Sequence, residues 1–306
     1  MGLSSEVLFT RGFILNNYTN AIIGEMAFCN VMETDYGSEF VKPKNWGKFK
    51  PSVDKLLNDK PFIRNHTCDV IRECYDKVPN KIWWTGGNLN NYPIRIDNIY
   101  NPSDFIASTG DKISGISLKE GLGNNTLKNL GIEIFKKNLG IDFSHLNPLK
   151  SQIEKVFFPS NIVNQEDRKK WYKKNKSRII NEIDEVSSII VSSYCDYLFK
   201  NLNLINRVEP RYFKDFIVSV CLNACEEKCK APQYFRVYFD ENKIKIENPY
   251  SDYRIKNISR GAPLNLVKKD KKTIIVLSDN LPLMEVTIKY SSDRLCSSIK
   301  IICKSL

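Results

Sequence analysis

Short runs in which apolar and polar residues alternate are the clearest pattern in this chain, and they predict β-strands. Residues 105–107 and 113–118 flank the turn sequence 109–112 and predict a β-hairpin. The aromatic run 81–84 and the alternating run 94–97 predict two strands before it. Five more runs fill the last quarter of the chain, and we expect them to form an antiparallel sheet: 234–239, 243–247, 273–277, 284–290 and 298–303.

A helical period of about 3.6 residues marks other segments. It predicts a first helix over residues 18–32 and another over 127–138, which would pack on the sheet. Residues 152–203 are expected to be largely helical, with a long amphipathic helix over 179–202, and a further helix is expected over 212–230. Together these elements predict an α/β (α+β) fold with a helical insertion and antiparallel strands at its C-terminal end.

A chain of 306 residues is long enough for a sizeable core, in two domains or in one large one. Its 42% of apolar and 26% of charged residues are typical of a soluble globular protein. No apolar run reaches the ~18 to 20 residues of a membrane span, and the N-terminus lacks the basic start and apolar stretch of a secretion signal. We therefore expect an intracellular protein without a membrane partner, in the cytoplasm or in the nucleus of a eukaryotic host.

Lysine and arginine outnumber aspartate and glutamate by 46 to 35, which gives a net charge of +11 and a pI near 9.1. An excess of this size favours a polyanionic partner such as a nucleic acid, because neutralising each phosphate releases counterions. The chain is also rich in Lys, Asn and Ile, as AT-rich genomes encode, so codon bias is a second source of the basicity.

The nine cysteines are odd in number and lack the spacing of a disulfide framework, so we expect them to stay reduced. Cys221, Cys225 and Cys229 recur every four residues and would follow one face of a helix. That spacing allows a metal or iron–sulfur site, but Ile217 and Leu222 share the face and no CxxC pair is present. Small apolar core positions explain the three cysteines better.

Candidate chemistry gathers on the predicted hairpin. Alternation places Ser117 and Lys119 on one face of its second strand, and Asp104 starts its first strand, where it faces Lys119 if the register pairs them. A carboxylate can hold a divalent metal, and a neighbouring ammonium can orient a water or offset charge on a phosphate. The alternative is an ordinary exposed hairpin in which Asp104 caps a turn and Lys119 is a solvent-exposed side chain on an edge strand.

Glu25 falls on the apolar face of the first helix, between Ile22, Cys29 and Met32. A carboxylate there needs a metal ion or a lysine as its partner, because burying it alone is unfavourable. If it lies at the border of the buried stripe, it reaches water instead. Asp97, just before the hairpin, is a further candidate metal ligand or else a solvated strand residue.

The sequence Pro102-Ser103-Asp104, followed by a hairpin and by Ser117-Leu118-Lys119, resembles the motif of the PD-(D/E)XK nuclease superfamily. The resemblance implies a restriction-endonuclease-like core in the order α-β-β-β-α with a mixed sheet. It also implies Mg²⁺ or Mn²⁺ held by Asp104 and Glu25, with Lys119 and Ser117 completing the catalytic set. Ser117 stands where the family usually carries a second acid, which is similar to the Ser-x-Lys variants of viral and phage nucleases. Glu120 would replace that acid if a bulge turned it to the other face of the strand.

Two basic segments are candidates for contact with phosphates. The first combines Trp171 and Tyr172 with seven basic residues, namely Arg168, Lys169, Lys170, Lys173, Lys174, Lys176 and Arg178. The second, residues 42–51, alternates lysines such as Lys48 with aromatic residues such as Trp46. Each segment can instead be a solvated basic surface whose aromatic residues anchor it to the core.

These features predict a nuclease-like core over residues 1–150, a helical basic region over 151–230 and a C-terminal β region over 231–306, which could form one compact unit with the core. The expected function is that of a hydrolase, a metal-dependent endonuclease that binds and cuts double-stranded DNA in restriction or in viral or phage genome processing. The alternatives are a catalytically inactive nucleic-acid-binding protein on the same scaffold and an RNA-cleaving endonuclease of the cap-snatching type. A homodimer is compatible with each function.

Overall fold

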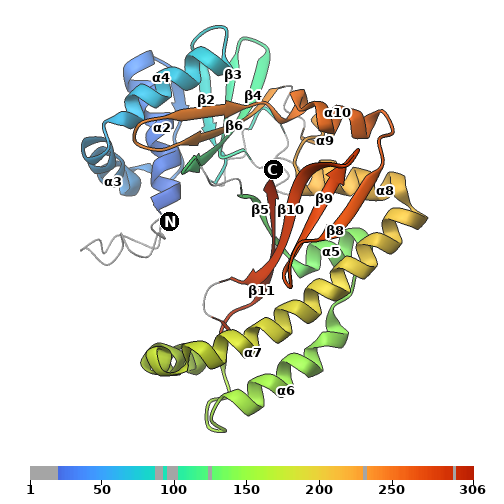
Figure 1. Ribbon diagram of the computed structural model, residues 1–306. Helices are drawn as coiled ribbons and strands as arrows, with labels where there is room; N and C mark the ends of the chain where they lie inside the picture. Colours follow the sequence, from blue (N-terminus) through green and yellow to red (C-terminus); the bar gives the residue numbers. More distant parts are fainter. Residues whose placement is uncertain (1–19, 87–91, 95–102, 123–125, 230–232, 292–293) are drawn as a thin grey trace. The chain divides into compact units, whose positions relative to one another are not determined.

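The computed structural model describes residues 20–86, 92–94, 103–122, 126–229, 233–291 and 294–306. The chain divides into two compact units (Figure 1): unit 1 comprises Met1–Asn124 and Asn223–Asp252, and unit 2 comprises Asn125–Leu222 and Tyr253–Leu306. Each unit has its own sheet, so the fold is mixed α/β with two sheets. Among the residues placed in the structure, none of the helices has both the length and the apolar character needed to cross a membrane.

Unit 1 is built around a mixed sheet of six strands. Its elements are α2 (Asn20–Tyr36), β1 (Glu39–Val41), α3 (Trp46–Asp59), α4 (Phe62–Cys74), β2 (Lys81–Trp84), β3 (Phe105–Thr109), β4 (Lys112–Glu120), α9 (Glu226–Cys229), β6 (Gln233–Phe239), β7 (Ile244–Glu247) and the 3₁₀ turn η3 (Pro249–Ser251). The strands lie in the order β1-β2-β3-β4-β6-β7. Strand β3 is antiparallel to both of its neighbours, β6 is parallel to β4, β1 is parallel to β2, and β7 is antiparallel to β6.

The predicted hairpin is confirmed as β3 and β4, and its turn contains Gly110 at a φ of +61°. That backbone conformation is open to glycine because it has no Cβ. Side chains alternate between the two faces of the sheet, and one face packs against α2, α3 and α4. The core on this face joins strands to helices: Ile82, Trp84, Phe105, Ile116, Leu118 and Val237 with Met26, Phe28, Phe49, Val53, Ile63 and Val70.

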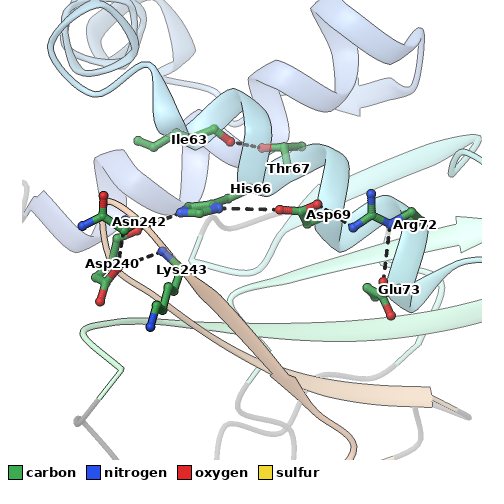
Figure 2. Close-up of polar contacts among 9 residues, drawn as sticks. All are labelled: Ile63, His66, Thr67, Asp69, Arg72, Glu73, Asp240, Asn242 and Lys243. Atoms are coloured by element: carbon green, nitrogen blue, oxygen red, sulfur yellow. Dashed lines mark hydrogen bonds and ion pairs between the residues drawn. The ribbon is translucent and has the colours of Figure 1, made fainter.

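A buried histidine ties α4 to the turn between β6 and β7 (Figure 2). Its ring nitrogen, His66 Nε2, lies 2.7 Å from the carbonyl oxygen of Asp240. On the other side of the ring, Nδ1 lies 3.8 Å from the carboxylate of Asp69. The Asp240 side chain closes the turn, because Oδ1 accepts hydrogen bonds from the backbone N–H groups of Asn242 and Lys243. These contacts hold the β6–β7 hairpin against α4.

Unit 2 is built around a second, wholly antiparallel sheet. Its elements are β5 (Thr126–Gly131), α5 (Ile132–Leu139), the 3₁₀ turn η1 (Ser144–Leu146), α6 (Asn147–Phe157), α7 (Gln165–Val208), α8 (Pro210–Asp215), the π-helix η2 (Phe216–Cys221), α10 (Tyr253–Ser259), β8 (Leu264–Lys268), β9 (Thr273–Ser278), β10 (Leu281–Tyr290) and β11 (Ile299–Ser305). The strands lie in the order β5-β11-β10-β9-β8. Helix α7 is one helix of 44 residues that packs against β8, β9 and β10.

Two of the predicted helices are wrong. Residues 127–138 do not form one helix, because their first half is strand β5, which pairs with β11, and α5 begins only at Ile132. Tertiary pairing here overrides a local apolar period. The helix predicted over 212–230 ends with η2 at Cys221, and Asn223 takes a φ of +48° before α9 begins. Cys221 and Cys225 therefore do not share one continuous helix face.

The strand predicted over 94–97 lies outside the described residues except for its first residue, and most of the other predicted elements differ mainly in their limits. The first helix is present as α2 and continues to Tyr36, where Gly37 at a φ of +77° ends it. The strands of the last quarter belong to both sheets, because β6 and β7 pair beside β4 in unit 1 and β8 to β11 lie in unit 2. The two units consequently do not follow the expected boundaries at residues 150 and 230.

Candidate functional site

Asp104 is the centre of a cluster of polar side chains in unit 1. It lies directly before β3, and its backbone N–H donates to the carbonyl oxygen of Ile116 at 2.7 Å. Its Oδ2 accepts hydrogen bonds from the Leu118 N–H at 2.6 Å and from Ser117 Oγ at 3.2 Å. Lys119 Nζ lies 3.9 Å from the same oxygen. The hairpin therefore brings Asp104, Ser117 and Lys119 together, which is the arrangement that the alternating pattern predicts.

Glu25 joins this cluster from helix α2. Its Oε2 accepts a hydrogen bond of 2.8 Å from Trp84 Nε1. Burial raises the pKa of Glu25 to about 8, and the negative charge of Asp104 adds to the rise. The Trp84 hydrogen bond and the positive charge of Lys119 act in the opposite direction. Glu25 is thus within electrostatic reach of both Asp104 and Lys119, on the buried side of α2 that its position on the helix predicts.

The two carboxylates of the cluster are held in a buried environment. Burial raises the pKa of Asp104, whereas Lys119, the Leu118 N–H and the Ser117 hydroxyl lower it. Neighbouring carboxylates resist ionising together unless a cation compensates them. Among the described residues, none donates a hydrogen bond to Asp104 Oδ1 or to Glu25 Oε1. Both oxygens can therefore accept from water or bind a cation.

Carboxylate oxygens are the donors that hard cations such as Mg²⁺ and Mn²⁺ prefer. The set is small, because the described part of the chain contains no group of three or more His, Cys, Asp or Glu side chains placed to hold a metal ion. Ser117, which lies beside Asp104, adds a hydroxyl to the cluster in place of a third carboxylate and donates a hydrogen bond to Asp104. Two carboxylates fit a cation that takes its other ligands from water and substrate.

Glu120 does not join the cluster. Strand β4 keeps its regular pairing with β6 through Glu120, without the bulge that would turn this side chain toward Lys119. Its carboxylate instead forms an ion pair of 2.7 Å with Lys60. The further candidate ligand Asp97 lies outside the described residues, as does Pro102 of the sequence motif.

Sequence reasoning misses three residues that support the site: Trp84, Tyr234 and Arg236. The parallel pairing of β4 with β6 places Tyr234 beside Gly115 and Arg236 beside Ser117, and both side chains are buried. Burial raises the pKa of Tyr234, and the charge of Arg236 opposes this rise. The strand signal of residues 234–239 is visible in the sequence, but no local pattern identifies β4 as its neighbour.

The basic start of α7 contains three anchoring residues. Arg168 Nη1 lies 2.7 Å from the carboxylate of Glu154, and its guanidinium lies 5.2 Å from the ring centre of Phe158. Trp171 packs edge-on against Phe158 with ring centres 5.4 Å apart, and Tyr172 is buried. Arg168, Trp171 and Tyr172 therefore anchor the helix in unit 2, with Tyr172 buried and Arg168 and Trp171 partly exposed.

The other basic residues of this segment face solvent to different degrees. Lys169 is half-buried, and the exposed residues are Lys170, Lys173, Lys174, Lys176 and Arg178. Lys170 forms an exposed ion pair of 3.3 Å with Glu166. In the second basic segment Lys48 is exposed on α3, while Trp46 packs against Phe40 with ring centres 5.2 Å apart. The aromatic residues of both segments are thus anchors, and the lysines remain candidates for phosphate contact.

Comparisons of the chain with protein-family models, with curated proteins and with solved structures found no match. A functional assignment therefore starts from the chemistry of Glu25, Asp104, Ser117 and Lys119.

Glu25→Gln should make the protein more stable, relative to wild type, as the pH rises toward 8. The folded pKa of about 8 exceeds the ordinary value of 4.5, so between these values the folded state binds more protons and its stability falls with rising pH. Glutamine keeps an acceptor for Trp84 and does not ionise. The stability of the variant relative to wild type should grow by up to about 1.4 kcal/mol per pH unit in this window. Urea unfolding between pH 5 and 8 measures it, and a difference that is constant with pH would contradict the assignment.

Gly115→Ala should displace Asp104, because a Cβ at position 115 would meet the hydroxyl of Ser103 at 2.1 Å. Ser103 immediately precedes Asp104, and its buried side chain must rotate or move there, because its Cβ would also lie 3.2 Å from the new methyl group. We expect a loss of about 1–3 kcal/mol in the free energy of unfolding. Gly24→Ala is the matched control beside Glu25, because nothing lies within 4 Å of its added Cβ. In helix α2 this alanine should be neutral or stabilising by up to about 1 kcal/mol. Equal stabilities of the two variants in chemical denaturation would rule out the close approach.

Proposed function

We propose that this protein is a divalent-metal-dependent nuclease that hydrolyses phosphodiester bonds in DNA. The observation that carries the proposal is the gathering of Glu25 from helix α2, Asp104 from the residue before β3 and Lys119 from strand β4. Two carboxylates with raised pKa values beside an ammonium group are more typical of catalytic sites than of structural ion pairs.

The order of elements in unit 1 supports a restriction-endonuclease-like core. Along the chain, unit 1 contains α2, strands β2, β3 and β4, the short helix α9 and strand β6, with β1, α3 and α4 between α2 and β2. Their strands lie in the order β2-β3-β4-β6, with β6 parallel to β4. These elements support the α-β-β-β part of the α-β-β-β-α order that the PD-(D/E)XK resemblance implies. The last helix of that order, expected over 127–138, is not formed there, because its first half is strand β5 of unit 2. Ligands of such sheets commonly bind outside the carboxyl ends of parallel strands, and Lys119 lies at that end of β4.

Each residue of the cluster has a role in the proposal. Glu25 and Asp104 would hold Mg²⁺ or Mn²⁺, and the bound cation would supply Lewis-acid chemistry at the phosphate. Ser117 holds the Asp104 carboxylate in place through its hydrogen bond. Lys119 would orient the attacking water or offset the charge that develops on the phosphate. The water oxygen forms a bond to phosphorus, a P–O bond of the backbone breaks, and the leaving oxygen takes up a proton.

The small number of acidic ligands supports a second candidate function. Two carboxylates are few for a divalent cation, and the described residues offer no third acidic side chain within the cluster. The alternative is a nucleic-acid-binding protein that keeps the nuclease scaffold without the chemistry. A substrate of RNA in place of DNA is compatible with the same cluster, because its groups act on the phosphate.

Asp104→Ala and Lys119→Ala should each lower the rate of cleavage by roughly 10²- to 10⁴-fold. Lys112→Ala is the matched control, because Lys112 lies at the other end of β4 in an exposed ion pair with Asp76. Plasmid DNA, linear DNA and RNA are incubated with each variant in Mg²⁺ or Mn²⁺. A wild type that cuts none of them, or site variants that cut as well as the control, would exclude the nuclease. If only RNA is cleaved, the proposed substrate is wrong and the proposed active site stands.

Calorimetric titration with Mn²⁺ separates the nuclease from the inactive binding protein. In the nuclease, wild type binds Mn²⁺ and Asp104→Ala binds it far more weakly. The affinity should rise as the pH approaches 8, where Glu25 ionises. Salt-sensitive DNA binding without affinity for Mn²⁺ at any pH would support the inactive scaffold.

The exposed lysines of α7 should supply part of the non-specific affinity for DNA. Replacing Lys173, Lys174 and Lys176 with Gln should weaken binding and lower the slope of log affinity against log salt by about 0.9 for each phosphate that is no longer neutralised. Folding should be unchanged, because these side chains are exposed. Arg168→Gln is the contrasting variant, which should lose about 1–3 kcal/mol of stability, because it removes the nearer of two cations from the nearly buried Glu154 carboxylate and leaves Lys150 at 3.7 Å. An unchanged salt slope in the folded triple variant would place the binding face elsewhere, with Lys48 the next candidate.

A further inference from the structure

Lys119, Tyr238 and Lys245 form a row across three adjacent strands of the unit 1 sheet. The parallel register of β4 and β6 pairs Lys119 with Tyr238, and the antiparallel register of β6 and β7 pairs Tyr238 with Lys245. Residues paired in this way point to the same face of a sheet. With neighbouring strands about 4.8 Å apart, the Cα atoms of the two lysines are separated by about 10 Å.

Tyr238 is the buried middle of this row, and the two lysines are its accessible ends. Tyr238 is 1% exposed, whereas the side chains of Lys119 and Lys245 are 25% and 58% exposed. The ammonium group of Lys245 lies 6.0 Å from the centre of the Tyr238 ring, which favours a side chain lying across that ring. The row therefore offers two ammonium groups to solvent, one of them beside Asp104.

The charges around the row favour an anionic partner. Lys119 Nζ is 3.9 Å from Asp104, and Lys245 Nζ is 2.6 Å from Glu247. Arg236 is paired with Glu247 in the neighbouring row, so cations outnumber carboxylates in the two rows. An ion pair as exposed as that of Lys245 and Glu247 contributes little in water, so a phosphate can replace the carboxylate as the partner of Lys245.

We propose that Lys245 is a substrate-binding residue that takes a second backbone phosphate, so that a nucleic-acid strand held at Lys119 continues along the row toward β7. The inference rests on the proposed function and adds the direction in which the strand leaves the site. The phosphates of one strand follow one another at a distance well above the axial rise of about 3.4 Å per base, so about 10 Å between the two lysines spans one to two nucleotides. Lys245 therefore contacts a phosphate one or two nucleotides from the bond at Lys119, and the buried Tyr238 lies between the two lysines in the sheet.

Three variants test the row by binding alone. Lys245→Gln removes the cation, and Glu247→Gln releases that cation from its carboxylate. Lys112→Gln is the matched control, because Lys112 is also exposed, at 65%, and also ion-paired, but lies at the opposite end of β4. A short fluorescein-labelled DNA strand is titrated with each variant in EDTA, which prevents cleavage, at several salt concentrations. Circular dichroism confirms that each variant is folded.

Lys245→Gln should weaken binding about two- to fivefold and lower the salt slope by about 0.7, the value for one phosphate on a single strand. Glu247→Gln should tighten binding by a similar factor, and Lys112→Gln should leave both quantities unchanged. Wild-type affinity and salt slope in Lys245→Gln would overturn the inference. An equal loss in Lys112→Gln would overturn it as well, because the effect would then be one of net charge.

Failure of the row and failure of the nuclease give different results. If Asp104→Ala stops cleavage while Lys245→Gln binds as wild type does, the nuclease stands and the strand takes another path. If wild type binds DNA in a salt-dependent way and cuts nothing, the proposed nuclease function is wrong, and Lys245→Gln still decides whether the row holds the strand. If wild type binds no nucleic acid, both the proposed function and the role of Lys245 are wrong.

Discussion

Asp104 makes three hydrogen bonds to strand β4: its backbone N–H donates to Ile116, and its carboxylate accepts from the N–H of Leu118 and the hydroxyl of Ser117. These bonds set where β3 begins relative to β4. A slip of one residue would move Ser117 and Lys119 to the core face of the sheet and bring Leu118 to the site, because side chains alternate strictly. The register of the hairpin and the geometry of the site are consequently one constraint, and the same carboxylate serves both.

Holding the carboxylates of Glu25 and Asp104 close together in a partly buried site lowers the stability of the folded protein. Burial raises the pKa values of both Glu25 and Asp104, and their mutual repulsion adds to the rise at Glu25. The opposing interactions come from the surrounding structure, through the Trp84 indole, the Lys119 ammonium and the hydrogen bonds of strand β4 to Asp104. The apolar core beneath, which packs α2 against the sheet, keeps the carboxylates from moving apart. A bound cation would offset the repulsion between the two carboxylates. Without a cation, replacing one of the two acids with a neutral residue should make the folded protein more stable.

The parts of the fold that depend on neighbours in sequence could be predicted. The hairpin follows from a turn between two alternating runs, and the position of Glu25 follows from the helical period, so all four cluster residues come from local patterns. Strand β6 could not be placed, because its parallel partner β4 ends 113 residues earlier in the chain and pairing at that distance leaves no local signal. Arg236 therefore cannot be assigned to the site from the sequence. The sequence of strand β5 is predicted as helix, because its apolar spacing is compatible with either a helix or a strand. Pairing with β11 makes it a strand.

Ser117 is best understood through the charges that already surround it. An acid at this position would be the third carboxylate next to Asp104 and Glu25, and it would raise their pKa values further unless a cation were bound. A hydroxyl gives up one metal ligand and donates to Asp104, which lowers the pKa of that carboxyl instead. A serine at position 117 therefore keeps the charges of the site better balanced without a metal ion than an acid would. The same serine would lower the affinity of the site for a metal ion. Because Arg236 is its partner on the neighbouring strand β6, position 117 lies where an acid would also be drawn toward a fixed cation and away from any cation that Asp104 and Glu25 would hold.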